Sequence, residues 1–170
     1  MNGDKDQIPT PSSTDVVWWF PEIPIIALVL FLDRFSKHLA VTYLVSGESV
    51  QFIPGLLKLL YSTNTGAAFS ILSNQRIVLS LFSIIVIGLM VYWRNYLTMG
   101  LPFLRLVWSL VLAGALGNLW DRILRGYVVD FLAFDFIVFP VFNMADIAIS
   151  CGGLLYLLFL LSTEFKQGKR

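Results

Sequence analysis

Long hydrophobic segments dominate the pattern of this chain, and polar, glycine and proline residues gather between them. Four of the segments come near the ~20 residues that a helix needs to cross a bilayer. The pattern therefore predicts an all-α integral membrane protein with four transmembrane helices. The predicted helices cover about residues 23–45, 77–93, 103–120 and 144–161.

Two of the intervening stretches are long enough to form structure of their own. Residues 46–73 are a polar–apolar mixture, in which a Pro-Gly pair at 54–55 separates two apolar runs. This arrangement predicts a small extracytoplasmic β-hairpin or cradle. Residues 126–141 are too short and too interrupted to span, so we expect an interfacial loop or helix along the membrane surface. The phenylalanines expected to dip into the membrane there are Phe131, Phe134, Phe136 and Phe139.

The composition agrees with a membrane protein. Hydrophobic residues make up 57% of the 170 residues and charged residues only 14%, against about 25% charged in an ordinary soluble domain. We expect a single membrane domain over residues 18–165, opening with interfacial aromatic residues at 18–20. A disordered cytoplasmic tail at 1–17 and a basic cytoplasmic tail at 166–170 flank it. The net charge of +1, without a basic stripe interleaved with aromatics, argues against nucleic acid as a partner.

Basic residues predict the orientation. An even number of spans places both termini on one side, together with the connection between the second and third spans. That connection carries Arg94 and Arg105, and the end of the chain carries three more basic residues. By the positive-inside rule both termini are cytoplasmic. Residues 46–73 and 121–143 then share the outer face.

Two carboxylates stand in almost wholly apolar surroundings. Asp130 follows the third span, and Asp146 begins the fourth. An ionised carboxylate in such a setting is costly unless it has a partner. Two carboxylates brought together form an acid–base device, because like charges at close range do not both ionise easily. We expect the pair to meet at the membrane surface and cleave a peptide bond; a small proton-coupled membrane transporter could use the same two aspartates.

The first span carries an unusual number of ionisable residues. Asp33 and Lys37 are four residues apart, in the favourable orientation for an ion pair, and we expect a structural or substrate-facing pair. Arg34 and His38 could equally well be solvated near the helix end, where long side chains reach the interface.

Polar rows also end the third span. Asn118 and Arg122 are four residues apart, as are Asp121 and Arg125. We expect Asp121 and Arg125 to form a surface salt bridge. Arg122 could instead face inward, near Asp130.

The fourth span has a clear helix start. Asn143 is a good N-cap, and Asp146 then falls in the first turn, where the helix dipole favours negative charge. We therefore expect Asp146 to be ionised and Asp130 to carry the proton that the pair shares.

Other catalytic chemistries find little support. His38 is the only histidine, and neither a nucleophile elbow nor a zinc-protease motif occurs. Ser36 and Lys37 are adjacent on a helix, so their side chains point apart. Cys151 is the only cysteine, and we expect it to pack as a small residue within the fourth span.

Five motifs occur in a fixed order from the first span to the fourth. The motifs are D-x-x-S-K at 33–37, NTGAAFS at 64–70, GALGNLWDR at 114–122, VVDF at 128–131 and FNMAD at 142–146. A chain with these motifs resembles the lipoprotein signal peptidase family of bacteria, also called signal peptidase II.

The resemblance implies an intramembrane aspartic endopeptidase of the bacterial inner membrane, with its active site at the periplasmic face and without a metal or cofactor. Its implied substrates are prolipoproteins whose lipobox cysteine carries diacylglycerol, and it removes the signal peptide by cutting before that cysteine. Membrane lipid and globomycin-type cyclic peptide inhibitors are further implied partners.

The motif match also assigns residues. Asp130 and Asp146 are the implied catalytic dyad. On residue types alone, 63–70 would be a plain loop, and only the resemblance brings it into the site. Arg34 departs from the family, which usually has glutamine there, and we expect the exchange Arg34→Gln to change little. The implied substrate-binding and support residues are Asp33, Lys37, Asn64, Gly66, Asn118, Arg122, Asn143 and Ala145.

Overall fold

The computed structural model describes residues 21–66, 72 and 74–167. The predictions for the tail at 1–17, the aromatic residues at 18–20 and the chain end at 168–170 lie outside this part.

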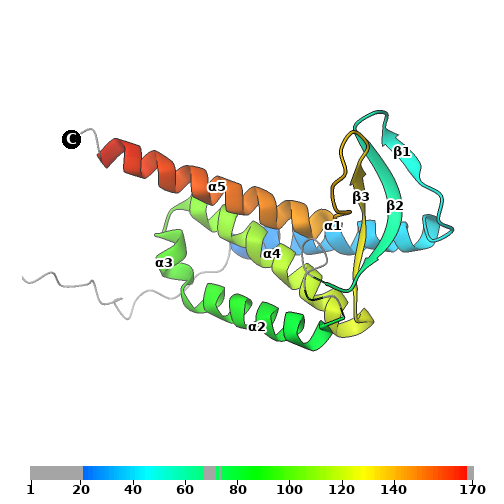
Figure 1. Ribbon diagram of the computed structural model, residues 1–170. Helices are drawn as coiled ribbons and strands as arrows, with labels where there is room; N and C mark the ends of the chain where they lie inside the picture. Colours follow the sequence, from blue (N-terminus) through cyan, green and yellow to red (C-terminus); the bar gives the residue numbers. More distant parts are fainter. Residues whose placement is uncertain (1–20, 67–71, 73, 168–170) are drawn as a thin grey trace, which may run out of the picture.

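The described part of the chain contains four long helices, which form a bundle (Figure 1). They are α1 (Glu22–Tyr43), α2 (Arg76–Tyr92), α4 (Pro102–Arg125) and α5 (Met144–Gln167), and a short helix α3 (Arg94–Thr98) precedes α4. Helix α4 packs against each of α1, α2 and α5. It is therefore the central element of the bundle.

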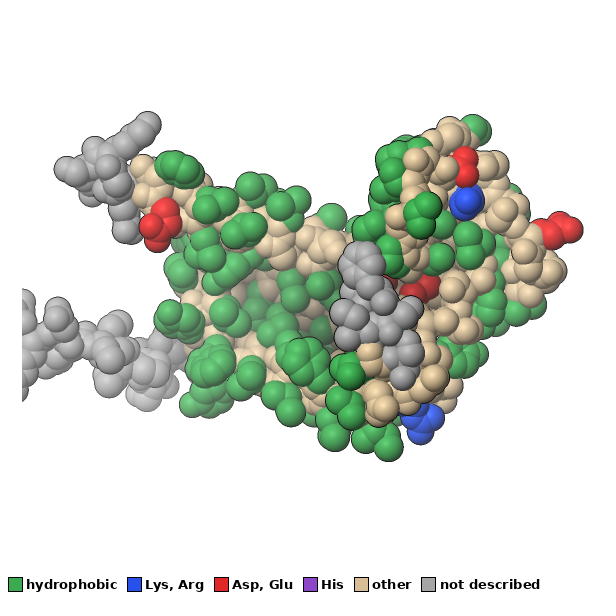
Figure 2. Space-filling model, viewed as in Figure 1, with side chains coloured by type: hydrophobic (Ala, Val, Ile, Leu, Met, Phe, Trp, Pro, Cys, Tyr) green, Lys and Arg blue, Asp and Glu red, His purple; other side chains and the backbone are tan. Residues whose placement is uncertain are grey.

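The helices differ in their suitability for a membrane. By length and composition, α4 and α5 are able to cross one, and α2 is apolar but shorter. Helix α1 carries Asp33, Arg34 and Lys37 in its middle. Hydrophobic side chains cover much of the visible surface of the helices, whereas the visible charged side chains lie mainly toward the ends of the molecule (Figure 2).

A three-stranded antiparallel sheet stands at one end of the bundle (Figure 1). Its strands are β1 (Val50–Ile53), β2 (Leu57–Asn64) and β3 (Val128–Phe134), with β2 in the centre. Strands β1 and β2 are the predicted hairpin. Its turn contains Gly55 at a φ of +73°, a left-handed conformation that glycine adopts without steric cost.

The prediction of an interfacial loop or helix over residues 126–141 is wrong for its first half, which is strand β3. All but the last residue of β3 are buried. Phe131 packs in the core with Ala40 instead of dipping into a membrane. A strand covered on both faces has no polar–apolar alternation, so its sequence does not read as a strand. Among the following residues, Phe136 and Phe139 are exposed.

A register shift in the sheet sets the geometry near Asp130. Between Leu59 and Ser62, β2 departs from regular pairing with β3. Beyond this bulge, Ser62 pairs with Asp130 and Asn64 with Val128. Bulges bend a strand and redirect its side chains. The end of β2 thus lies alongside Asp130.

An ion cluster joins the start of α1 to α3 and α4. Glu22 is fully buried and pairs with Arg94, while Arg105 Nε lies 3.9 Å from Glu22 Oε1. The two basic residues used to predict the orientation therefore also hold this end of the bundle together.

Close helix contacts depend on glycines in α4 and α5. A Cβ atom at Gly114 would lie 2.4 Å from the carbonyl oxygen of Ala145, and one at Gly152 would lie 2.6 Å from Val111 Cγ2. A Cβ at the neighbouring Gly153 would meet nothing within 4 Å. The α4–α5 contact therefore requires glycine at 152 and not at 153.

We expect Gly152→Ala to destabilise the fold by about 1–3 kcal/mol, because the added methyl overpacks the α4–α5 contact. Gly153→Ala is the matched control on the same helix, and it should be neutral or stabilising by about 0.5–1 kcal/mol. Thermal unfolding in detergent measures both. Equal unfolding midpoints for the two variants would contradict this packing.

Candidate active site

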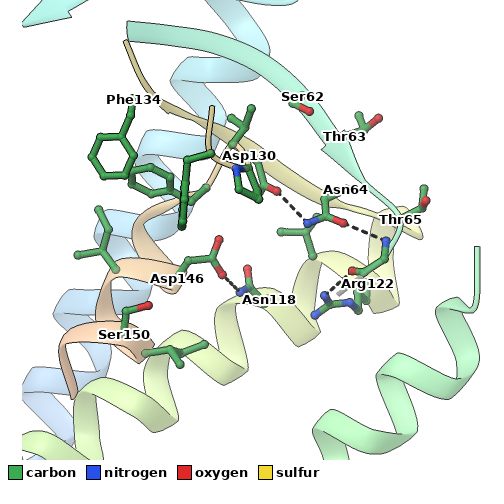
Figure 3. A pocket seen from close by; sticks show the side chains of 18 of the residues that line it. Ser62, Thr63, Asn64, Thr65, Asn118, Arg122, Asp130, Phe134, Asp146 and Ser150 are labelled. Carbon is green, nitrogen blue, oxygen red and sulfur yellow. Dashed lines mark hydrogen bonds between the residues drawn. The ribbon is translucent and has the colours of Figure 1, made fainter. Parts of the chain in front are cut away.

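Asp130 and Asp146 line one cavity of about 690 Å³. Asp130 lies on β3 and Asp146 in the first turn of α5, and Figure 3 shows them entering the cavity from these two elements. The end of β2, the end of α4 and the segment before α5 complete the walls. The structure thus brings together the two acids that the sequence singled out.

Asn143 contacts both acids. Its Oδ1 accepts a hydrogen bond from the backbone N–H of Asp146 at 3.0 Å, and its own N–H donates to Asp146 Oδ2 at 3.2 Å. This reciprocal arrangement is a capping box, so the predicted N-cap is confirmed. The Asn143 side chain also donates from Nδ2 to Asp130 Oδ1 at 2.6 Å. One buried asparagine therefore starts α5 and bridges the two acids.

Two further amides bind the remaining carboxylate oxygens. Asn118 Nδ2 donates to Asp146 Oδ1 at 2.7 Å, and Asn64 Nδ2 donates to Asp130 Oδ2 at 3.1 Å (Figure 3). Donors from β2, α4 and the α5 start thus orient all four carboxylate oxygens. Fixed orientation of this kind is what acid–base chemistry on a bound substrate requires.

Burial, and after it the nearby negative charge of Asp146, raise the pKa of Asp130 to about 6. Hydrogen bonds from Asn143 and Asn64 to the ionised form oppose this shift in the pKa of Asp130. Asp130 is thus able to hold a proton under mildly acidic conditions where an ordinary aspartate has lost it.

Arg122 faces the cavity, as one of the two interpretations of its position predicted. Its Nη2 donates to the carbonyl oxygen of Gly66 at 3.1 Å, and the N–H of Gly66 donates to Asn64 Oδ1 at 2.9 Å (Figure 3). Arg122 thereby supports the backbone that carries Asn64. The residues at 64–66 are part of the site and not a plain loop.

The predicted Asp33–Lys37 pair is present, with Lys37 Nζ 3.0 Å from Asp33 Oδ1 and both side chains buried. Lys37 also donates to Asn118 Oδ1 at 3.2 Å. Asp33 Oδ1 accepts the backbone N–H of Ala145 at 3.1 Å. The pair is therefore structural, and it holds two neighbours of Asp146.

The expected salt bridge between Asp121 and Arg125 is present, but its expected place at the surface is wrong, because Asp121 is fully buried. Its nearest cations come from α1: Arg34 Nη1 at 2.8 Å and Lys37 Nζ at 2.9 Å. Arg125 is a more distant neighbour at 3.6 Å. Arg34 is consequently part of a buried network and not simply solvated at a helix end.

Several cavity-lining residues were not predicted. Cys151 is exposed on α5 and borders the cavity, so it does not pack as expected. Phe139 and Phe142, after β3, form another wall. Phe142 begins the FNMAD motif, but neither residue was assigned a role at the site. The lining residues that were not singled out from the sequence include Ser62, Phe139, Phe142, Ser150 and Cys151. Within the described part of the chain, no group of three or more His, Cys, Asp or Glu side chains is placed to hold a metal ion.

A helical bundle with long apolar helices and two oriented acids in a cavity defines the class, a membrane enzyme. The chain belongs to the signal peptidase II family: the family model, described as signal peptidase (SPase) II, matches residues 25–162. It is therefore a protease of a bacterial membrane.

Individual relatives agree with this assignment. The lipoprotein signal peptidase of Enterococcus faecalis is 40% identical over 152 residues, covering 84% of this chain and 90% of the relative. That of Brevibacillus brevis is 42% identical over 131 residues, covering 75% and 86%. Two solved bacterial membrane enzymes superpose with TM-scores of 0.80 and 0.73 at 34% and 32% identity. Each match covers 85% of this chain, and 90% and 94% of the solved chains, respectively.

We expect Asn64→Ala to raise the pKa of Asp130 further above its ordinary value, because the variant removes a donor that stabilises the ionised carboxylate. Thr63→Ala, at a neighbouring cavity-lining position, is the control and should leave the pKa of Asp130 at about 6. Infrared difference spectra of the protonated carboxyl band against pH measure the effect, with Asp130→Asn identifying the band. An unchanged midpoint in Asn64→Ala would contradict the assigned hydrogen bond.

Proposed function

We propose that this protein is an aspartic endopeptidase that removes the signal peptide from diacylglyceryl-modified prolipoproteins, cutting before the lipidated cysteine. Asp130 and Asp146 are the proposed catalytic dyad. The observation that carries the proposal is their shared cavity, in which Asn143 hydrogen-bonds both acids. Membership of the signal peptidase II family supports the substrate class.

The proposed roles of the two acids differ. Asp146 is the base: it lies at a helix start and accepts hydrogen bonds from Asn118 and the Asn143 backbone, which favours the carboxylate. Asp130 is the acid, since its raised pKa of about 6 favours the protonated form. Coupled acids titrate as a pair, so this assignment describes the dominant singly protonated state.

Peptide hydrolysis then proceeds through an attacking water. Asp146 takes a proton from the water while Asp130 donates its proton to the scissile carbonyl oxygen, which gives a tetrahedral diol. In the second step the C–N bond breaks, the leaving amine takes the proton from Asp146, and one diol hydroxyl returns its proton to Asp130. The dyad ends in its starting protonation state, and no covalent intermediate forms.

The cavity suits a substrate with one polar and one lipid-soluble part. Asn64, Asn118 and Arg122 lie around the dyad, where a peptide backbone needs hydrogen-bond partners. Ile147 and Ile149 continue the lining along α5, beside which the acyl chains would lie. Because the polar and apolar walls are continuous, the cavity favours a substrate whose scissile peptide bond lies next to its lipid anchor.

The proposed membrane arrangement has four spans, formed by α1, α2, α4 and α5. Both termini then lie in the cytoplasm, and the sheet and the dyad lie at the outer face. Helices α4 and α5 support this by length and composition, and the ionisable groups in the middle of α1 are held by partners on α4. The transporter hypothesis is not favoured, because the chain belongs to a protease family.

Asp130→Asn and Asp146→Asn should each reduce cleavage by about 10²–10⁴-fold or more, because each removes one proton-transfer group. Asp135→Asn is the control: this carboxylate follows β3 but pairs with Lys58 and Gln51, so cleavage should stay within about two-fold of wild type. The assay incubates purified protein with a diacylglyceryl prolipoprotein and its unlipidated form, and mass spectrometry reads the products. Normal cleavage by either dyad variant would refute the dyad.

The pH dependence of kcat/KM should report the pKa of Asp130, the proposed proton donor. Activity requires protonated Asp130, so kcat/KM should fall as the pH rises through about 6, the raised pKa of that carboxyl. The Asp135→Asn control should have the same alkaline limb. A kcat/KM that stays constant between pH 5 and pH 8 would show that Asp130 does not act as the proton donor.

A further inference from the structure

The two aspartates of the proposed dyad are each preceded by a residue whose backbone is held by a buried carboxylate. Asp33 Oδ1 accepts the N–H of Ala145, directly before Asp146. Asp121 Oδ2 accepts the N–H of Val129, directly before Asp130, at 3.4 Å. The supporting carboxylates thus hold the chain on both sides of the cavity.

Arg34 joins these two supporting carboxylates through a single planar group. Its Nη1 donates to Asp121 Oδ1 at 2.8 Å, and its Nη2 donates to Asp33 Oδ2 at 2.9 Å. Nη2 also donates to the carbonyl oxygen of Gly117 at 3.1 Å, which fixes the guanidinium against α4. A guanidinium is rigid and planar, so the separation of the oxygens that it bridges is defined by its own geometry.

The glycine at 117 makes this bridge possible. A Cβ atom there would lie 2.8 Å from Asp33 Oδ2, the oxygen that Arg34 binds. Lys37 provides a second link, since its Nζ lies 3.0 Å from Asp33 Oδ1 and 2.9 Å from Asp121 Oδ2. The two cations and two carboxylates form a closed ring of balanced charge, as a buried cluster requires.

We propose that Arg34 is a positioning residue for catalysis, which sets the spacing of the dyad by holding Asp33 and Asp121 at a fixed separation. The proposal rests on the proposed function, because it takes Asp130 and Asp146 as the reacting groups. Arg34 touches neither of them and acts through the backbone of Val129 and Ala145. A misplacement of about 1 Å in a catalytic group can cost 10²-fold in rate, so a small change in the bridge is sufficient.

Two substitutions of Arg34 separate the effect of the planar guanidinium group from the effect of its positive charge. Arg34→Lys keeps the positive charge, but the ammonium group lacks the two coplanar NH2 groups with which the guanidinium binds both carboxylates. Arg34→Gln removes the charge as well, and because Arg34 bridges Asp121 and Asp33, the proposal replaces the sequence-based expectation that this exchange changes little. Arg125→Gln is the matched control, because Arg125 approaches the same oxygen of Asp121 at 3.6 Å and has a similarly exposed side chain, 35% against 29% for Arg34. Arg125 contacts Asp121 from within α4 and does not bridge to Asp33.

The experiment measures kcat and KM for a diacylglyceryl prolipoprotein with the purified full chain in lipid, normalised to the folded fraction from thermal unfolding. We expect kcat to fall at least ten-fold in both Arg34→Lys and Arg34→Gln, with KM within about three-fold of wild type. Arg125→Gln should keep kcat within two-fold. A merely structural role would lower the unfolding midpoint while leaving kcat per folded molecule unchanged.

The outcomes separate this proposal from the proposed function. Asp130→Asn is measured in parallel; if it cleaves normally, the dyad is wrong and the positioning role goes with it. If Asp130→Asn is inactive while either Arg34 variant keeps a kcat within two-fold of wild type, the positioning role alone is overturned. If the Arg34 variants do not fold, Asp33→Glu is measured in their place. It keeps every charge but lengthens one arm of the bridge, and a kcat within two-fold of wild type would equally overturn the proposal.

Discussion

Buried charge is the constraint on which this structure depends. Asp33, Lys37, Asp121 and Asp130 are almost completely inaccessible, in a protein whose surface is largely hydrophobic. Each such group needs partners supplied by the protein itself. The helices and the sheet must therefore meet where the donors and acceptors match. The polar network thus does more than occupy the core, because it specifies how α1, α4, α5 and β3 are placed relative to one another.

Helix α4 connects the supporting network to the site. Asn118, about two turns before its end, accepts a hydrogen bond from Lys37 and donates one to Asp146. Arg122 supports the end of β2, and Asp121 faces the cations of α1. Asn118, Asp121 and Arg122 lie within five positions of one another, and together they contact α1, the start of α5 and the end of β2. This is possible because successive side chains of a helix point in different directions, about 100° apart.

The sequence predicted features that depend on local spacing. The hairpin at its Pro-Gly turn, the N-cap at Asn143 and the Asp33–Lys37 pair all follow from residues at most a few positions apart. It failed where the cause lies far away along the chain. Asp121 was assigned to its neighbour Arg125, whereas its closest partner Arg34 is 87 positions distant. Strand β3 was missed because neighbouring elements cover both its faces, and only the assembled fold supplies them.

Asp146 both caps a helix and lines the cavity, and this double role limits which residues of the site can change under selection by an inhibitor. The same carboxylate accepts the first free N–H of the helix start and faces the cavity. A bacterium that altered Asn143 or Asp146 to escape a cavity-bound inhibitor would also weaken the beginning of α5. Escape substitutions are therefore more readily tolerated at the exposed wall, such as Phe139 or Cys151, which neither cap a helix nor orient an acid. A compound anchored on Asn118, Asn143 and the two acids, and not on that wall, leaves few viable substitutions.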